Sequence, residues 1–225
     1  MANINMHDLI SYMDGIGKSI FTLADISKIT GKESKYLSLL LSKSRYVSRI
    51  ERGKYYTKNA DILQIASMVV FPSYISLFAA LRYYSLTTQE LKKISVITTR
   101  RHKNISVQKE LIAFKQINKK RLFGFIKKEG IFIANIEKAI IDSLYFKEPP
   151  YSYVLDAFRR ALADNLMDIQ KLQHYCILME SKTLRSIVGY MLESEGINAD
   201  KLYPGTKKYI KISGIKPIKN RWRIK

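Results

Sequence analysis

The chain has 225 residues, a hydrophobic share of 47% and a formal net charge of +20 from 39 basic and 19 acidic side chains. This composition is typical of a globular protein and excludes a disordered one. A single cysteine, Cys176, excludes an internal disulfide and a zinc site made of cysteines. We find no signal peptide, and the longest apolar stretch, residues 65–71, is too short to span a bilayer. We therefore expect a cytoplasmic protein with no membrane partner.

The positive charge is concentrated in three segments. Residues 1–58 carry ten basic and five acidic side chains, residues 92–128 carry twelve and one, and residues 201–225 carry nine and none. Residues 129–200 have a net charge of −4. Such an excess favours a polyanionic partner, with nucleic acid as the first candidate. An anionic membrane surface, an acidic protein, or a lysine-rich composition without any partner are the alternatives.

Two helices are predicted at the N-terminal end. The first spans residues 3–13, where apolar side chains recur at helical spacing: Met6, Leu9, Ile10 and Met13. The second begins after Thr22, which can cap it, and Asp25 three positions later comes close to a capping box. Gly31 stands where this helix must end and turn. The side chains expected to point inward are Leu23, Ile26 and Ile29.

A third helix follows the turn. Leu37, Leu40 and Leu41 repeat at intervals of three and four and predict its buried stripe. The opposite face carries small hydroxyls and a lysine, which suit close approach to base edges and phosphates. The sequence leaves open whether Leu39, near that face, contacts a thymine methyl or packs inside. The face comprises Ser34, Lys35, Ser38 and Ser42, with Tyr36 at its edge.

A two-stranded ribbon completes the N-terminal segment, with Gly53 in its turn. Short helices joined by a glycine-containing turn and followed by such a ribbon predict a winged helix-turn-helix DNA-binding domain over residues 1–58. Winged helices that bind only proteins are the alternative. The candidate DNA contacts are Lys32, Ser34, Lys35, Tyr36, Ser38, Ser42, Lys43, Arg45, Arg49, Arg52 and Lys54.

Residues 59–225 predict a second domain, after a short linker at 57–61. Residues 61–84 indicate two helices separated at Pro72, the second capped by Ser73. Short β-branched and aromatic runs between residues 94 and 133 predict an antiparallel sheet. Its basic residues form a candidate second basic surface: Arg100, Arg101, Lys103, Lys119, Lys120 and Arg121.

The C-terminal part is predicted to be helical, so that the fold class is α+β. Asn135 caps the first of these helices, Ser152 opens the second, and Gly196 closes the last. The predicted ranges are residues 135–148, 152–163, 167–180 and 182–195. The tail indicates two strands, 209–212 and 222–224, around Gly214 and Pro217.

With these segments in order, the chain resembles the AbiEi-type antitoxins, transcriptional regulators of viral-defence (type IV toxin–antitoxin) systems. The resemblance covers about residues 20–145. It depends on the order of several short motifs, each of which alone is weak. These motifs are residues 21–26, 52–56, 72–77, 80–84, 96–99, 123–125 and 134–142.

The resemblance implies a winged helix that binds inverted repeats of double-stranded DNA in its own promoter, with a second copy on the other half-site. It also implies a C-terminal domain that counters a nucleotidyltransferase-like toxin without an obligatory complex. The signature of Glu137, Lys138, Ala139 and Asp142 is interpreted as structural, with Glu137 stabilising the first helical turn.

We expect no enzyme, cofactor or metal. The histidines His7, His102 and His174 are scattered, and neither a nucleophile elbow nor a glycine-rich phosphate loop is found. A Gly-Ser followed by paired aspartates, expected of a nucleotidyltransferase, is missing too. The alternatives to a repressor and antitoxin are a solitary regulator without a toxin, an RNA-binding protein that uses the basic sheet, and a protein-interaction module.

Overall fold

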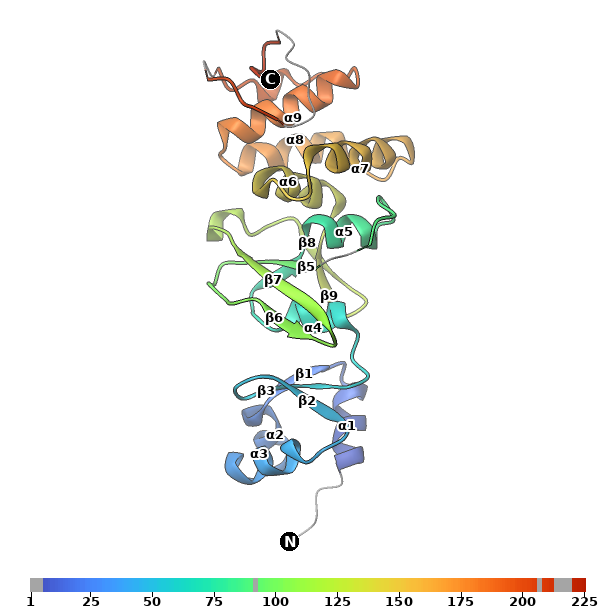
Figure 1. The fold of residues 1–225 in the computed structure, drawn as a ribbon, viewed down its shortest axis with the longest axis vertical. Helices are drawn as coiled ribbons and strands as arrows, with labels where there is room; N and C mark the ends of the chain where they lie inside the picture. The colour runs from blue at the N-terminus through green and yellow to red at the C-terminus, as the bar shows by residue number, and fades with distance from the viewer. Residues whose placement is uncertain (1–5, 91–92, 206–207, 213–219) are drawn as a thin grey trace.

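The structure is a computed structural model that describes residues 6–90, 93–205, 208–212 and 220–225. The fold is α+β. Three tiers follow one another along an elongated molecule (Figure 1): a small N-terminal unit of helices and a sheet, then a larger sheet, then a group of helices. We call the N-terminal unit, from α1 to β3, the head, and the rest the second domain.

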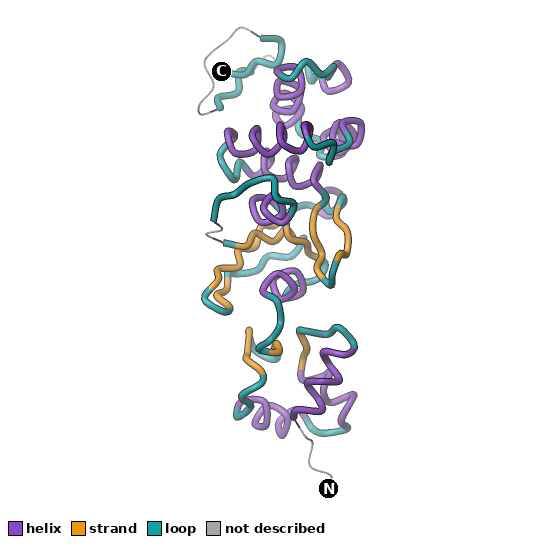
Figure 2. The backbone as a smooth tube through the Cα atoms, turned by 90° about the vertical axis from the view of Figure 1, so that its right-hand side faces the viewer, coloured by secondary structure: helices purple, strands orange, loops and turns teal. Residues whose placement is uncertain are grey.

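The head contains three helices and a three-stranded antiparallel sheet in the order β1-β3-β2. In Figure 1 the sheet lies on the side of the head nearest the second domain, with α2 and α3 beyond it and α1 beside it; Figure 2 shows the head turned by 90°. Its elements are α1 (Met6–Gly15), β1 (Ile20–Thr22), α2 (Leu23–Thr30), α3 (Ser34–Ser42), β2 (Val47–Glu51) and β3 (Lys54–Thr57).

The predicted start and end of α2 are confirmed. The backbone N–H of Thr22 donates to Asp25 Oδ2 at 2.7 Å, and the N–H of Asp25 donates to Thr22 Oγ1 at 3.2 Å, which completes the capping box. Gly31 ends the helix with φ of 67°, a conformation that favours glycine. These contacts fix the angle at which α2 enters the turn before α3.

Three details of the head differ from the prediction. Strand β1 was not expected, because its three residues are too few to show a period. Ile29 was expected to point inward, but its side chain is 44% exposed, since the short helix turns it away from the core. Leu40 is only half-buried, so the stripe of α3 consists mainly of Leu37 and Leu41.

Strand β3 separates two hydrophobic clusters. Phe21 and Tyr55 face the head helices, together with Leu37 and Leu41. The neighbouring residues Ile20 and Tyr56 belong instead to the large cluster of the second domain. Side chains alternate between the two faces of a strand, so adjacent residues of β1 and β3 line different cores. The head is thereby packed directly onto the second domain.

The second domain begins with a six-stranded sheet and two helices. Strands β4, β5 and β9 lie in its interior, and α4 and α5 pack against it. The elements are α4 (Ile62–Met68), β4 (Ser73–Ile75), α5 (Leu77–Tyr83), β5 (Ile94–Thr98), β6 (Ile105–Val107), β7 (Glu110–Gln116), β8 (Phe125–Lys128) and β9 (Ile131–Ala134).

The predicted antiparallel sheet is wrong, because the sheet is mixed. Its order is β6-β7-β5-β4-β9-β8, and the pairs β5–β7 and β4–β9 are parallel. The reason is that the hairpin of β6 and β7 folds back so that β7 runs alongside β5. Strand β4 then enters between β5 and β9.

Strand β4 lies where the sequence predicted the start of a helix capped by Ser73. Tyr74 and Ile75 are fully buried in the sheet, and the helix α5 begins only after Ser76. The hydroxyl of Ser73 donates to the carbonyl of Ser67 at 2.9 Å instead of capping α5. Burial between two strands has overridden the local helical pattern.

The C-terminal helices agree closely with the predicted ranges. Asn135 caps α6 by accepting from the N–H of Lys138 at 3.0 Å, as expected. The helix α7 begins one residue before Ser152, after Pro150. The elements are α6 (Ile136–Phe146), α7 (Tyr151–Ala163), α8 (Ile169–Leu178) and α9 (Lys182–Ser194), with single 3-10 turns at Lys119–Arg121 and Asp200–Leu202.

Among the described residues of the tail, Ile210 and Ile224 form an isolated parallel bridge. The two tail strands that the sequence indicated are therefore not formed as such. Gly214 and Pro217 lie outside the described residues. Within the described part of the chain, no helix combines the length and apolar character needed to cross a membrane.

Candidate nucleic-acid interface

Helix α3 lies near the end of the molecule that is farthest from the second domain (Figure 1). One of its faces is polar. Leu37 and Leu41 are 0% and 3% exposed and anchor the helix to the head core. A helix repeats every 3.6 residues, so the residues opposite this stripe must face solvent. Lys35 and Ser42 are exposed there, and Lys35 has no ion pair among the residues that the structure describes.

An open groove runs along this face. It includes the predicted contacts Ser34, Lys35, Tyr36, Ser38 and Ser42. The groove also contains residues that the sequence analysis did not select: Leu23 and Glu33. Glu33 precedes α3 and makes no capping hydrogen bond through its side chain, so its carboxylate can accept from a partner, as acidic side chains do from cytosine N4. A serine, threonine, aspartate or asparagine before α3 would have marked the N-cap position in the sequence, whereas a glutamate does not.

The other predicted contacts around α3 differ in their exposure and in their contacts within the protein. Lys43 is exposed just after the helix, whereas Lys32 is half-buried in the preceding turn, where its carbonyl accepts from Ser27 Oγ at 2.8 Å. Arg45 is exposed, but its guanidinium donates to the hydroxyl of Tyr46 at 2.9 Å and lies 5.0 Å from the centroid of that ring. Arg45 is thus held beside the end of α3.

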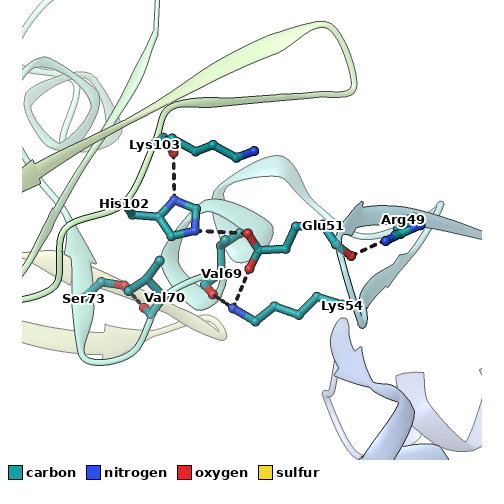
Figure 3. A network of polar contacts seen from close by, with 8 residues as sticks. All are labelled: Arg49, Glu51, Lys54, Val69, Val70, Ser73, His102 and Lys103. Carbon is teal, nitrogen blue, oxygen red and sulfur yellow. Dashed lines mark hydrogen bonds and ion pairs between the residues drawn. The ribbon is translucent and has the colours of Figure 1, made fainter. Parts of the chain in front are cut away.

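The turn of the β2–β3 hairpin contacts the second domain, as Figure 3 shows. Lys54 Nζ lies 2.7 Å from Glu51 Oε1 and donates to the carbonyl oxygen of Val69 at 2.7 Å. The prediction that Lys54 reaches DNA therefore needs correction, because its ammonium group is already engaged across the domain junction. Arg52 is exposed at the turn, and exposed Arg49 donates from Nε to the carbonyl of Glu51 at 3.1 Å.

His102 joins the same junction from the second domain. Its Nε2 lies 3.1 Å from Glu51 Oε2, and its Nδ1 lies 2.7 Å from the carbonyl oxygen of Lys103. Burial acts to raise the pKa of Glu51, but the hydrogen bond and charge of Lys54, with a smaller contribution from His102, outweigh it and keep that pKa below its ordinary value. His102 belongs to the basic segment 92–128, and the structure places it half-buried against Glu51.

Five of the six residues of the second basic surface are exposed on neighbouring loops. Strands β5 and β7 are parallel, so the loops that follow them leave the same edge of the sheet. Gln116 Nε2 donates to the carbonyl of Thr99 at 3.1 Å and ties the two loops together. The exposed residues are Arg100, Arg101, Lys103, Lys119 and Lys120.

Arg121 departs from this surface. It is half-buried, donates to the hydroxyl of Tyr145 at 2.8 Å and lies 5.4 Å from the centroid of that ring. Its role is therefore to pack the 3-10 turn onto α6, and we remove it from the candidate phosphate contacts.

The signature on α6 forms a buried polar network. Lys138 and Asp142 are both 0% exposed and form an ion pair. The other carboxylate oxygen of Asp142 accepts from the hydroxyls of Tyr74 at 2.9 Å and Ser76 at 2.8 Å. The ammonium of Lys138 lies 4.7 Å from the ring centroid of Phe123. Every charge is paired inside the protein, which fits the structural interpretation.

Glu137 makes structural contacts in addition to the role expected in the first turn of α6. It lies in the first turn of α6, but its carboxylate accepts from the backbone N–H of Asp168 at 3.0 Å and lies 3.1 Å from Lys171 Nζ. It therefore ties the start of α8 to α6.

Among the described residues, no group of three or more His, Cys, Asp or Glu side chains is arranged to hold a metal ion. The exposed cationic and hydroxyl groups of α3, and the basic loops at the edge of the sheet, are the arrangements suited to a polyanion. The chain matches no family model and no curated protein, so its function is argued from this geometry.

Proposed function

We propose that this chain is a DNA-binding transcriptional regulator whose head is a winged helix and whose α3 enters the major groove. The observation that carries the proposal is the polar face of α3 at the free end of the molecule, which bears exposed Lys35 and Ser42 with half-buried Ser38 between them. A helix about 10–12 Å across fits a major groove about 12 Å wide. The groups on this face can donate to and accept from base edges.

The electrostatics support the same proposal. The chain carries a net charge of +20, and a DNA duplex attracts such a protein by releasing its condensed counterions. Lys43 and Arg45 follow α3 directly and are candidate phosphate contacts beside its base-reading face, and exposed Arg49 and Arg52 at the hairpin are further candidates. Lys54 is not part of this set, since it stabilises the junction with the second domain.

The basic edge of the second domain favours RNA as the second candidate ligand. The exposed groups after β5 and β7 converge at one edge of the sheet, at a distance along the chain from α3. In the DNA-binding proposal the same edge contacts phosphates beyond the site that α3 occupies. In the RNA-binding alternative it is the main site, and α3 contributes little.

The resemblance to AbiEi-type antitoxins supports a more specific proposal. In it, the chain represses its own operon by binding inverted repeats, and its second domain counters a nucleotidyltransferase-like toxin. Co-expression with a nucleotidyltransferase-like protein encoded by a neighbouring reading frame tests this part. Growth arrest by that protein, relieved by this chain, is expected. Without such a neighbour, a solitary regulator is the simpler proposal.

A gel-shift experiment tests DNA binding. The full chain is titrated at one salt concentration against the duplex upstream of its own gene, an unrelated duplex of equal length, and a single-stranded RNA. We expect tighter binding to the upstream duplex than to either competitor. Equal binding to both duplexes, or preference for the RNA, contradicts the sequence-specific proposal. When variants of α3 are compared in the same experiment, Lys182→Ala, which removes an exposed lysine of α9, is the control for the loss of one positive charge.

A further inference from the structure

Leu39 is an apolar side chain in the middle of a polar face. Its side chain is 58% exposed, and it does not belong to the residues packed against either hydrophobic cluster. The exposure excludes the packing role that the sequence left open. A leucine exposed to this degree contributes nothing to the core, so its apolar surface remains available to a ligand.

The neighbours of Leu39 define what it can contact. Lys35 lies one turn before it and Ser42 one turn after it on the same face, and all three line the open groove. Ser42 Oγ donates to the backbone carbonyl of Leu39 at 2.8 Å, so its proton is used within the helix. The centre of the face thus presents an aliphatic group, while the cation lies at its N-terminal side.

The major groove of DNA offers one aliphatic group, the methyl on C5 of thymine, and this group lies beside the polar edge of the base pair. Methylation at C5 of cytosine places the same group at the equivalent position. We propose that Leu39 reads the C5-methyl group of a pyrimidine, so that the chain prefers thymine or 5-methylcytosine over the unmethylated bases at one position of each half-site. This inference rests on the proposed function, since it requires α3 to lie in the major groove.

The size of the effect follows from the area that one methyl group buries. Burying one methyl-sized group between apolar surfaces changes a binding constant about fourfold. Replacing thymine by deoxyuridine removes the methyl and keeps every hydrogen-bonding group of the base. The substitution therefore isolates the apolar contact from the polar ones.

The experiment uses the full chain and a duplex selected from a random pool by repeated binding. The selected duplex is resynthesised with deoxyuridine in place of thymine at one position at a time, and, as a second pair that differs only in the methyl group, with 5-methylcytosine or cytosine opposite guanine at that position. For the wild-type chain we expect about fourfold weaker binding at one position of each half-site. Leu39→Ala is expected to bind the thymine and deoxyuridine duplexes equally.

Two controls separate the outcomes. Ile16→Ala removes a comparably exposed apolar side chain, 52% exposed after α1, and is expected to keep the preference for thymine. Circular dichroism checks that Leu39→Ala keeps its fold, as its exposure leads us to expect. Failure to select any duplex overturns the proposed function itself. Selection of a duplex with indifference to deoxyuridine at every position, or a preference that survives in Leu39→Ala, overturns only the role of Leu39.

Discussion

The helices α3 and α6 use lysine and small polar side chains in opposite ways. On α3, Lys35 is exposed and has no ion pair among the described residues, and the hydroxyls of Ser38 and Ser42 line the same open groove. On α6, Lys138 is fully buried and forms an ion pair with Asp142, whose other carboxylate oxygen accepts from two hydroxyls, one in β4 and one directly after it. A polar group whose partners are all inside the protein stabilises the fold, whereas a polar group without internal partners is available to a ligand. The contrast separates a structural signature from a candidate binding surface.

The largest expected effect comes from breaking the α6 network. Asp142→Ala leaves the ammonium of Lys138 buried without a counter-charge, which costs about 3–5 kcal/mol of the free energy of unfolding. Chemical denaturation measures the loss. Asp164→Ala, which removes an exposed carboxylate after α7, is the control and should change stability little. A loss below about 1 kcal/mol for Asp142→Ala would show that water or a rearrangement satisfies Lys138.

The matching change on α3 should affect binding and not folding. Lys35→Ala is expected to weaken binding to the cognate duplex by about 1–3 kcal/mol, if the lysine reads a base edge. Its free energy of unfolding should stay within about 0.5 kcal/mol of wild type, because the side chain has no partner among the described residues. Equal losses on cognate and random duplexes would assign Lys35 to a phosphate instead.

The capping box tests how much the start of α2 contributes to the stability of the chain. Thr22→Ala removes the acceptor for the N–H of Asp25 and should cost about 0.5–2 kcal/mol of stability. The measurement is thermal unfolding, with Thr22→Ser as the variant that keeps the hydroxyl. If the alanine and serine variants have the same stability, the hydrogen bond seen in the structure contributes nothing measurable.

Arg52 sharpens the contrast between the two sides of the hairpin turn. Arg52→Ala is expected to weaken binding to every duplex and to reduce the slope of log K against log salt by about one unit. Lys54→Ala is expected to leave that slope unchanged, since its ammonium is held at the domain junction. A lower slope for Lys54→Ala would show that the junction opens on DNA.

The smallest expected effect concerns the pH dependence of the junction. The pKa of Glu51 lies below its ordinary value of 4.5, so its contribution to stability is fully present above pH 4.5 and is lost as the pH falls through the lower, folded value. Glu51→Gln should remove this component, which we place below about 1 kcal/mol for a partly exposed pair. Stability measured between neutral and acidic pH for both proteins tests it. Parallel curves would contradict the assignment.

Local chemistry was sufficient to predict much of the fold. The capping box of Thr22 and Asp25, the glycine after α2 and the cap by Asn135 depend on residues within three or four positions of one another. Strand β4 could not be predicted in this way. Its three residues continue an apolar run that also suits a helix, and only pairing with β5 and β9 makes it a strand.

The candidate site shows the same limit. The exposed face of α3 follows from the spacing of Leu37 and Leu41, and the structure agrees with it. The engagement of Lys54 and the burial of Arg121 could not be foreseen, because their partners Val69 and Tyr145 lie 15 and 24 positions further along the chain. A charge count along a sequence cannot tell a cation that is held by the protein from one that is not.

Strand β3 has a consequence for how the molecule melts. Its two adjacent tyrosines, Tyr55 and Tyr56, belong to different hydrophobic clusters, so the strand contributes side chains to both clusters. If one cluster unfolds and β3 detaches, apolar surface of the other cluster becomes exposed to water. Cooperativity should therefore extend across the boundary near residue 58, and we expect calorimetry to record one heat-absorption peak with equal calorimetric and van't Hoff enthalpies.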